Sequence, residues 1–153
     1  MNRLTRRSGT LIAAALAIAI PVDGASAKIT HTSVAGIHLG KDESGLRDVL
    51  GPPSSIGDTD YGDAREFVFK RHKLSAILLD DAVVLLRTSS ASERTREGVG
   101  PGTSLRTMVR RVTGERCSSV RHQRVCSVRH GRTAMTFIGR GSRVAAVEIA
   151  TLP

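Results

Sequence analysis

One pattern occurs twice in this chain and limits its fold more than any other feature. Residues 36–53 read GIHLGKDESGLRDVLGPP, and residues 98–114 read GVGPGTSLRTMVRRVTG. Each stretch opens with Gly-Ile-x-x-Gly or Gly-Val-x-x-Gly and reaches a glycine that suits a helix C-terminus. The repetition predicts two copies of one structural unit. Two unrelated amphipathic helices in an α+β protein are the alternative.

Both stretches contain a short amphipathic helix. In the first, Leu46, Val49 and Leu50 have the i, i+3, i+4 spacing of one helical face. Thr103 or Ser104 can cap the second helix, whose apolar stripe consists of Leu105, Met108, Val109 and Val112. Each helix has about ten residues, which is too short for stability in isolation. We therefore expect a sheet to cover each apolar face.

Three strand-like runs follow each helix. They are residues 65–70, 74–79 and 82–87 in the first half, and 124–129, 132–138 and 143–150 in the second. The runs 74–79 and 82–87 are apolar at odd and even positions, which predicts strands covered on both faces; one buried helix is the alternative. Residues 54–63 are rich in turn formers and predict an exposed loop. The predicted fold class is therefore α+β. It comprises two tandem units, each a helix plus a three-stranded antiparallel meander, with the helices packed on one face of the sheet or sheets.

The N-terminus has the features of a secretory signal peptide. Three arginines precede an apolar run from Leu11 to Ile20, and Ala25-Ser26-Ala27 fits the small-x-small cleavage rule. The run is about half the length that a membrane-spanning helix needs, although an uncleaved anchor remains the alternative. We predict cleavage between Ala27 and Lys28, a secreted mature chain, and no transmembrane segment in it.

The remaining residues divide at a polar stretch. Residues 91–97 are the best linker candidate, so the predicted organisation is a signal at 1–27, a first unit at 28–90 and a second unit at 98–153. Aromatic side chains are few, namely Tyr61, Phe67, Phe69 and Phe137. Aliphatic side chains must therefore fill the core.

The two cysteines, Cys117 and Cys126, belong to the part of the chain predicted to be exported. A disulfide is favoured in that compartment, and we expect it to join the end of the second helix to the first strand of the second sheet. Closing a loop with eight residues inside stabilises the fold by roughly 2.5–3 kcal/mol. Free thiols or metal ligands are the alternative, but two cysteines without a second pair do not make a zinc site.

Charge is distributed unevenly along the chain. Residues 28–97 contain ten basic and eleven acidic side chains, whereas residues 98–153 contain ten arginines and two glutamates. Such asymmetry can mark a surface for an anionic partner, although a solvated arginine-rich exterior explains it equally well. The candidate patch consists of Arg121, Arg124, Arg129 and Arg132. We expect no nucleic-acid partner, because aromatic stacking platforms are lacking beside these arginines.

The motif at residues 36–53 resembles the signature of SmpA/OmlA (BamE-like) exported proteins, in which a hydrophobic-x-x-Gly segment leads a helix that ends in Leu-Gly-x-Pro. Two such units on a secreted, disulfide-containing chain are similar to the β-lactamase-inhibitory protein (BLIP-like) family. The resemblance implies that residues 28–90 and 98–153 are tandem repeats of this family. It also implies a non-catalytic protein whose helices cover one face of an antiparallel sheet and leave the other face open for a protein partner.

The sequence lacks the common catalytic and metal-binding motifs. No nucleophile elbow, P-loop or His-Glu-x-x-His occurs, and the five histidines lack metal-ligand spacing. Asp58, Asp60 and Asp63 share one loop but lack the later glutamate of an EF-hand. We therefore predict no catalytic residues, no metal and no cofactor. The predicted function is secreted, non-enzymatic binding of a protein or envelope component; the alternative is an arginine-rich envelope-associated adhesion or structural protein that binds anionic polymers.

Overall fold

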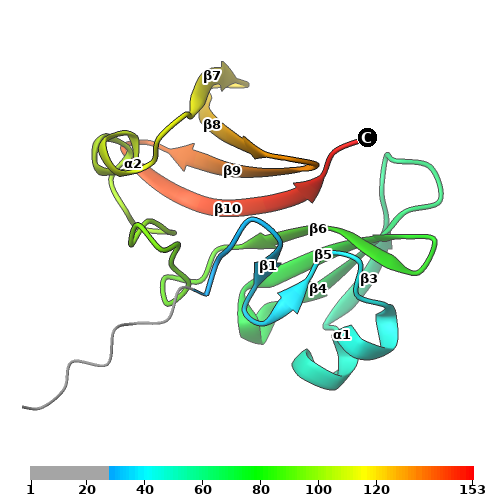
Figure 1. Cartoon of the computed structure of the whole chain (residues 1–153). Coiled ribbons are helices and arrows are strands. Elements are labelled where there is room, and N and C mark those ends of the chain that lie inside the picture. Colours follow the sequence, from blue (N-terminus) through cyan, green and yellow to red (C-terminus); the bar gives the residue numbers. More distant parts are fainter. Residues whose placement is uncertain (1–27) are drawn as a thin grey trace, which may run out of the picture.

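The computed structural model describes residues 28–153 and combines two helices, a small hairpin and one eight-stranded antiparallel sheet. Figure 1 shows this sheet twisting strongly between its two ends. The strand order is β3-β4-β5-β6-β10-β9-β8-β7, so the last strands of the two halves meet at the centre. The predicted signal, residues 1–27, and the cleavage position Ala27 lie outside the described residues.

The elements follow a simple order along the chain. The first half contains β1 (Ser33–Val34), β2 (Ile37–His38), α1 (Glu43–Leu50), β3 (Ser55–Asp58), β4 (Arg65–Phe69), a 3₁₀ turn (Lys70–His72), β5 (Leu74–Leu79) and β6 (Ala82–Thr88). The second half contains α2 (Leu105–Arg111), β7 (Arg116–Val120), β8 (Gln123–His130), β9 (Thr133–Arg140) and β10 (Arg143–Thr151).

Each helix begins at a capping side chain, and the cap of α2 is Ser104, one of the two predicted candidates. Asp42 caps α1 by accepting a hydrogen bond from the Gly45 amide at 2.9 Å, and Ser104 caps α2 by accepting one from the Thr107 amide at 3.1 Å. Gly51 ends α1 with φ 74°, a left-handed value that glycine adopts readily. On α2 only Met108 is fully buried and Val109 is exposed, because the helix is short and presents a narrow apolar stripe.

The prediction of a three-stranded meander in each half is wrong, because each half contributes four strands to the eight-stranded sheet. The additional strands are β3, within the segment predicted to be a loop, and β7. Every residue of β3 and β7 is exposed, so neither strand has the apolar alternation that reveals a half-buried strand in a sequence. They lie at the two outer edges of the sheet, where one side of the backbone has no neighbouring strand.

The prediction that residues 74–79 and 82–87 are covered on both faces is also wrong. Leu74, Ala76 and Leu78 are buried on one face of β5, whereas Ile77 is half-buried and Leu79 exposed on the other. β6 follows the same division, with Val83 and Leu86 buried. Helices cover one face alone, so the apolar side chains of the second face remain accessible.

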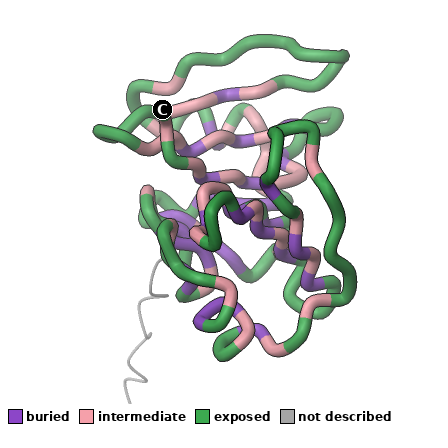
Figure 2. Tube along the Cα trace, turned by 90° about the vertical axis from the view of Figure 1, so that its right-hand side faces the viewer, coloured by how far each residue is buried: buried purple, intermediate pink, exposed green. Residues whose placement is uncertain are grey.

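The core lies on the helix-bearing face and runs across the sheet without interruption. In register from β4 to β9, the buried row consists of Phe67, Ala76, Leu86, Ile149 and Met135. Leu46 and Leu50 of α1 and Met108 of α2 belong to the same buried cluster. Figure 2 shows the buried residues concentrated in the interior of the fold, with exposed stretches of chain around the outside.

The segment predicted as a linker, residues 91–97, is packed against the core. Glu93 and Thr95 are buried, and the Arg94 carbonyl accepts hydrogen bonds from the Lys28 and Ile29 amides at 3.0 and 2.9 Å. The segment therefore fixes the beginning of the described chain to the loop between the two halves. Within residues 28–153 no helix has the length and apolar character required to cross a membrane.

The two glycine motifs make the same backbone hydrogen bonds to the sheet. The Gly40 amide donates to the Val83 carbonyl at 2.7 Å, and the Gly102 amide donates to the Val144 carbonyl at the same distance. In return, the amides of Val83 and Val144 each donate at 2.8 Å to the residue that follows the glycine. Each motif thus anchors its helix start to the last strand of its own half, β6 or β10.

Candidate binding surfaces

An apolar groove lies on the face of the sheet that carries no helix. We call this helix-free surface the open face. The groove is formed by the loop before β4, the β5–β6 hairpin, and residues 150–153, and has a volume of about 680 Å³. This is within the range of typical ligand sites. Its apolar walls include Ile77, Leu79, Leu85 and Leu152, and Tyr61 stands at its margin with 74 % of its surface exposed.

A row of polar side chains crosses the centre of the open face. The strand registers place it in the order Ser75, Arg87, Glu148, Thr136, Ser127, Arg116. Arg87 and Glu148 form an ion pair at 2.6 Å, and the hydroxyls of Ser127 and Thr136 are 2.9 Å apart. The ion pair links β6 to β10, and the hydroxyl contact links β8 to β9.

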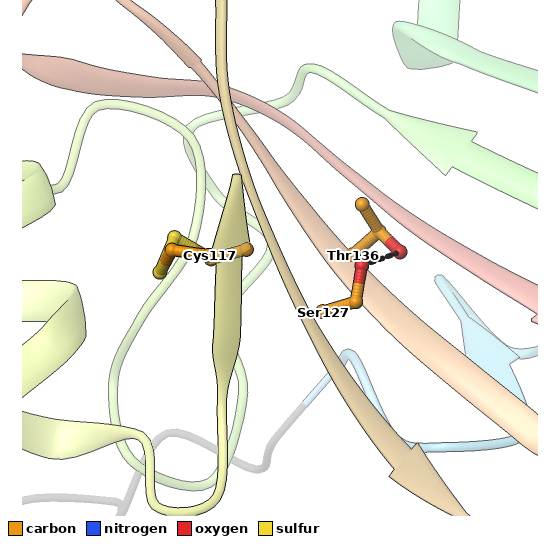
Figure 3. The surroundings of a disulfide bond; sticks show 4 residues. Cys117, Ser127 and Thr136 are labelled. Atoms are coloured by element: carbon orange, nitrogen blue, oxygen red, sulfur yellow. Dashed lines mark hydrogen bonds between the residues drawn. A yellow bond between two sulfur atoms is a disulfide. The ribbon is translucent and has the colours of Figure 1, made fainter. Parts of the chain in front are cut away.

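The predicted disulfide is confirmed. Cys117 on β7 and Cys126 on β8 are direct cross-strand partners with a Cα–Cα distance of 4.0 Å. The bond therefore joins the first two strands of the second half, and the expectation that it would join α2 to a strand is wrong. Figure 3 shows the disulfide beside the Ser127–Thr136 hydrogen bond. Because Cys126 and Ser127 are consecutive on a strand, they point to opposite faces.

The four arginines of the predicted patch do not form one cluster. Arg121 lies in the β7–β8 turn, Arg124 and Arg129 lie on β8, and Arg132 lies in the β8–β9 turn. Arg124 and Arg129 are five residues apart, which is roughly 17 Å along a strand, and they point to opposite faces. The structure thus separates the set into two pairs at opposite ends of β8. Their role in anion binding stays a prediction.

A second hollow on the open face brings Arg129 of the predicted patch together with Arg116, which lies outside that patch. It is lined by Gly114, Arg116, Ser127 and Arg129. Within residues 28–153 the ion pairs involve Arg47, Arg65 and Arg87, so no arginine of the second half takes part in one. Arg116, which sequence analysis missed, reaches this hollow because it pairs in register with Ser127.

Two histidines form a stacked pair between the N-terminal hairpin region and β8. The rings of His31 and His130 have centroids 4.5 Å apart and planes 17° apart. Burial lowers the pKa of His31, and the neighbouring His130 lowers it further, while Glu97 opposes both effects. The His31 Nδ1 atom is buried without a hydrogen-bond partner among the described residues. No group of three potential metal ligands occurs in residues 28–153.

Sequence reasoning missed the groove and the histidine pair for the same physical reason. Tyr61, Leu85 and Leu152 are far apart in the sequence and meet only because β6 pairs with β10. His31 and His130 are separated by 99 positions and share no spacing motif. The one available signal was Tyr61, an aromatic side chain within a polar, turn-rich stretch.

Comparison with known proteins identifies similar folds. No family model and no curated protein matches the chain. An extracellular protein containing a SCP domain from Bacillus anthracis aligns with a TM-score of 0.56 at 11 % identity, over 74 % of this chain and 44 % of its own. A cysteine-rich secretory protein from Staphylococcus aureus aligns with a TM-score of 0.54 at 13 % identity and the same coverage. A DUF4309 family protein (YjgB) from Bacillus subtilis aligns with a TM-score of 0.53 at 11 % identity, over 83 % of this chain and 89 % of its own.

These comparisons correct the sequence interpretation. The resemblance to SmpA/OmlA (BamE-like) and β-lactamase-inhibitory proteins is wrong, because the similar solved structures are the SCP-domain and DUF4309 proteins. At 11 to 13 % identity the likeness shows the fold alone. The chain spans less than half the length of the first two of these proteins. The chain therefore has a fold similar to those of extracellular and secretory bacterial proteins.

Proposed function

We propose that this protein is a secreted, non-enzymatic binding module whose partner, a protein or cell-envelope component, docks in the apolar groove of the open face. The observation that carries the proposal is the exposure of Tyr61 and Leu79 beside a groove of about 680 Å³. Exposed aromatic and aliphatic side chains around a concave site are the usual anchors of an interface. Arg132 lies at the same groove and can orient an acidic group of the partner.

A location outside the cytoplasmic membrane is supported by three observations. Residues 1–27 have the composition of an export signal. The Cys117–Cys126 disulfide suits an oxidising compartment. The titles of two proteins with similar folds describe those proteins as extracellular or secretory.

The groove is tested by comparing two exposed apolar side chains. Leu79 in the groove is 40 % exposed, and Val49 on α1 is 52 % exposed but lies outside it. The purified wild type, Leu79→Asp and Val49→Asp are used to capture partners from the envelope fraction of the producing cells. We expect one partner to be lost with Leu79→Asp and retained with Val49→Asp. Equal capture by all three proteins would contradict a role for the groove.

Anionic-polymer binding is the second candidate function, favoured by the second hollow. Arg116 and Arg129 lie together there without an acidic partner in the described chain. Contacts of this kind weaken steeply with salt. We expect the protein to elute from isolated cell walls at low salt. The double variant Arg116→Glu with Arg129→Glu should elute earlier than the matched double variant Arg96→Glu with Arg71→Glu. Elution unaffected by salt would exclude this candidate.

We also propose that residues 28–90 and 98–153 are copies of one unit, a helix followed by a four-stranded meander. Support comes from the equivalent hydrogen bonds of Gly40 and Gly102 to the sheet. Exchange of the motifs tests the proposal: residues 36–42 are replaced by the sequence of residues 98–104. We expect the chimera to keep the wild-type fold, whereas the same chimera with alanine at both left-handed glycines should be strongly destabilised. A chimera that does not fold would contradict the equivalence.

A further inference from the structure

Strand β7 is an unprotected edge of the sheet. It pairs with β8 along its whole length without a register shift, and all five of its residues are exposed. Proteins commonly protect an edge strand with proline, lysine, a bulge or a covering segment. Strand β7 contains no proline or lysine, and its exposure shows that no described segment covers it. Its outer side is therefore open to another strand.

The hairpin register determines which backbone groups face outward. Residues 121–122 form a two-residue turn with positive φ at both positions. The two residues that flank such a turn exchange both of their backbone hydrogen bonds. From that pair onward, non-hydrogen-bonded and hydrogen-bonded residue pairs alternate along the two strands. Cys117 and Ser119 consequently belong to non-hydrogen-bonded pairs. The short Cα–Cα distance of 4.0 Å between Cys117 and Cys126 agrees with this register. The backbone N–H and C=O groups of Cys117 and Ser119 thus point away from β8.

The charge around this edge is basic. Residues 115–132 contain five arginines and one acidic residue, Glu115. No arginine of this segment is in an ion pair within the part of the chain that the structure describes. The opposite edge, β3, carries Asp58 and is followed by Asp60 and Asp63. The two ends of the sheet therefore differ in the sign of their charge.

We propose that β7 is a docking edge for an extended acidic segment of a partner protein, which adds to the sheet as a ninth strand. Its backbone would pair with the outward groups of Cys117 and Ser119, and its acidic side chains would lie near Arg116 and Arg121. The disulfide constrains the β7–β8 ribbon before binding, which reduces the entropy lost on association. This site goes beyond the proposed function, because it is an edge of the sheet and lies outside the apolar groove.

Binding is measured with a synthetic peptide probe of ten residues in which glutamate alternates with valine, labelled for fluorescence anisotropy. Two further peptides serve as controls: one has lysine at each glutamate position, and the other has proline at alternate positions. We expect the acidic peptide alone to bind. In amide hydrogen exchange it should slow the exchange of Cys117 and Ser119, whose amides face the added strand. The amides of β3 should be unaffected.

Two pairs of variants separate backbone pairing from charge. Ser119→Pro removes the outward N–H at a position where an edge strand tolerates proline, and Ser119→Thr retains it. We expect at least tenfold weaker peptide binding for Ser119→Pro and a change below twofold for Ser119→Thr. Arg116→Glu should weaken binding severalfold, whereas Arg96→Glu, which changes the net charge equally in an exposed loop, should not.

Several results would overturn the proposal. One is equal peptide affinity of Ser119→Pro and Ser119→Thr in folded proteins; another is unchanged exchange of the Cys117 and Ser119 amides in the wild type with peptide bound. Concentration-dependent self-association that protects β7 without peptide would assign the edge to a second copy of the chain. Leu79→Asp should leave peptide binding unchanged, so failure of the edge and failure of the groove can be distinguished.

Discussion

Arg87 on β6 and Glu148 on β10 face each other across the only strand pair that joins the two halves of the described sheet. The Arg87 Nε atom and one terminal nitrogen lie 2.9 and 2.6 Å from the same oxygen of Glu148. The neighbouring pairs are Leu86 with Ile149 and Thr88 with Val147, and these side chains are buried on the opposite face. The junction therefore combines a core contact on one face with a partly exposed ion pair on the other.

The ion pair is expected to contribute modestly to stability. The Arg87 and Glu148 side chains are 50 % and 18 % exposed, so solvent screens their attraction. A double-mutant cycle with Arg87→Ala and Glu148→Ala should give a coupling energy of about 0.5–1 kcal/mol in urea denaturation. The exchanged variant, Arg87→Glu with Glu148→Arg, should recover most of the free energy of unfolding that is lost in either single charge reversal. A coupling energy near zero would show that the pair does not stabilise the junction.

Removal of the disulfide should destabilise the second half more than the first. Cys117→Ser with Cys126→Ser opens a short loop, and loop entropy predicts a loss of roughly 2.5–3 kcal/mol in the free energy of unfolding. Because the side chains of β7 are exposed, little burial holds this strand in place without the bond. Amide exchange should therefore accelerate in β7 while β10 remains protected. Equal unfolding midpoints for the variant and the oxidised wild type would contradict this expectation.

A methyl group at position 100 should be poorly tolerated. A Cβ atom on Gly100 would overlap the backbone carbonyl oxygen of Glu93, which a side-chain rotation cannot relieve. Gly100→Ala should lower the free energy of unfolding by about 1–3 kcal/mol. Gly57→Ala is the matched control, since its Cβ would meet no atom within 4 Å on the exposed strand β3. Similar thermal midpoints for both variants would show that the loop can adjust.

Stability should fall as the pH drops below the ordinary pKa of histidine. Burial and the stacked His130 lower the pKa of His31 in the folded protein, so the unfolded chain binds a proton first. The stabilisation that results from the lowered pKa of His31 is complete above the pKa of about 6.5 that histidine has in the unfolded chain. It is lost progressively as the pH falls below that value. Unfolding midpoints measured at pH 7.5 and 5.5 should differ less in His31→Gln than in the wild type. His122→Gln, in the exposed β7–β8 turn, is the control and should behave as the wild type.

The helices and most of the strands could be predicted because their signals are local. Asp42 and Ser104 have side chains that cap a helix, and Phe67 and Phe69 show the alternation of a half-buried strand. The left-handed turn at Asp80-Asp81 also follows from residues that tolerate positive φ. Strands β3 and β7 could not be predicted, because all of their side chains are exposed and their sequences therefore lack apolar alternation.

The sequence by itself determined the helix starts, the turns, the cysteine pair and the uneven charge, because each depends on residues close together along the chain. The tertiary structure alone decided that β6 pairs with β10, and with it the groove, the Arg87–Glu148 pair and the positions of the two sheet edges. Such pairing depends on contacts between residues about sixty positions apart. Local propensity and periodicity do not encode the choice of partner strand at that separation.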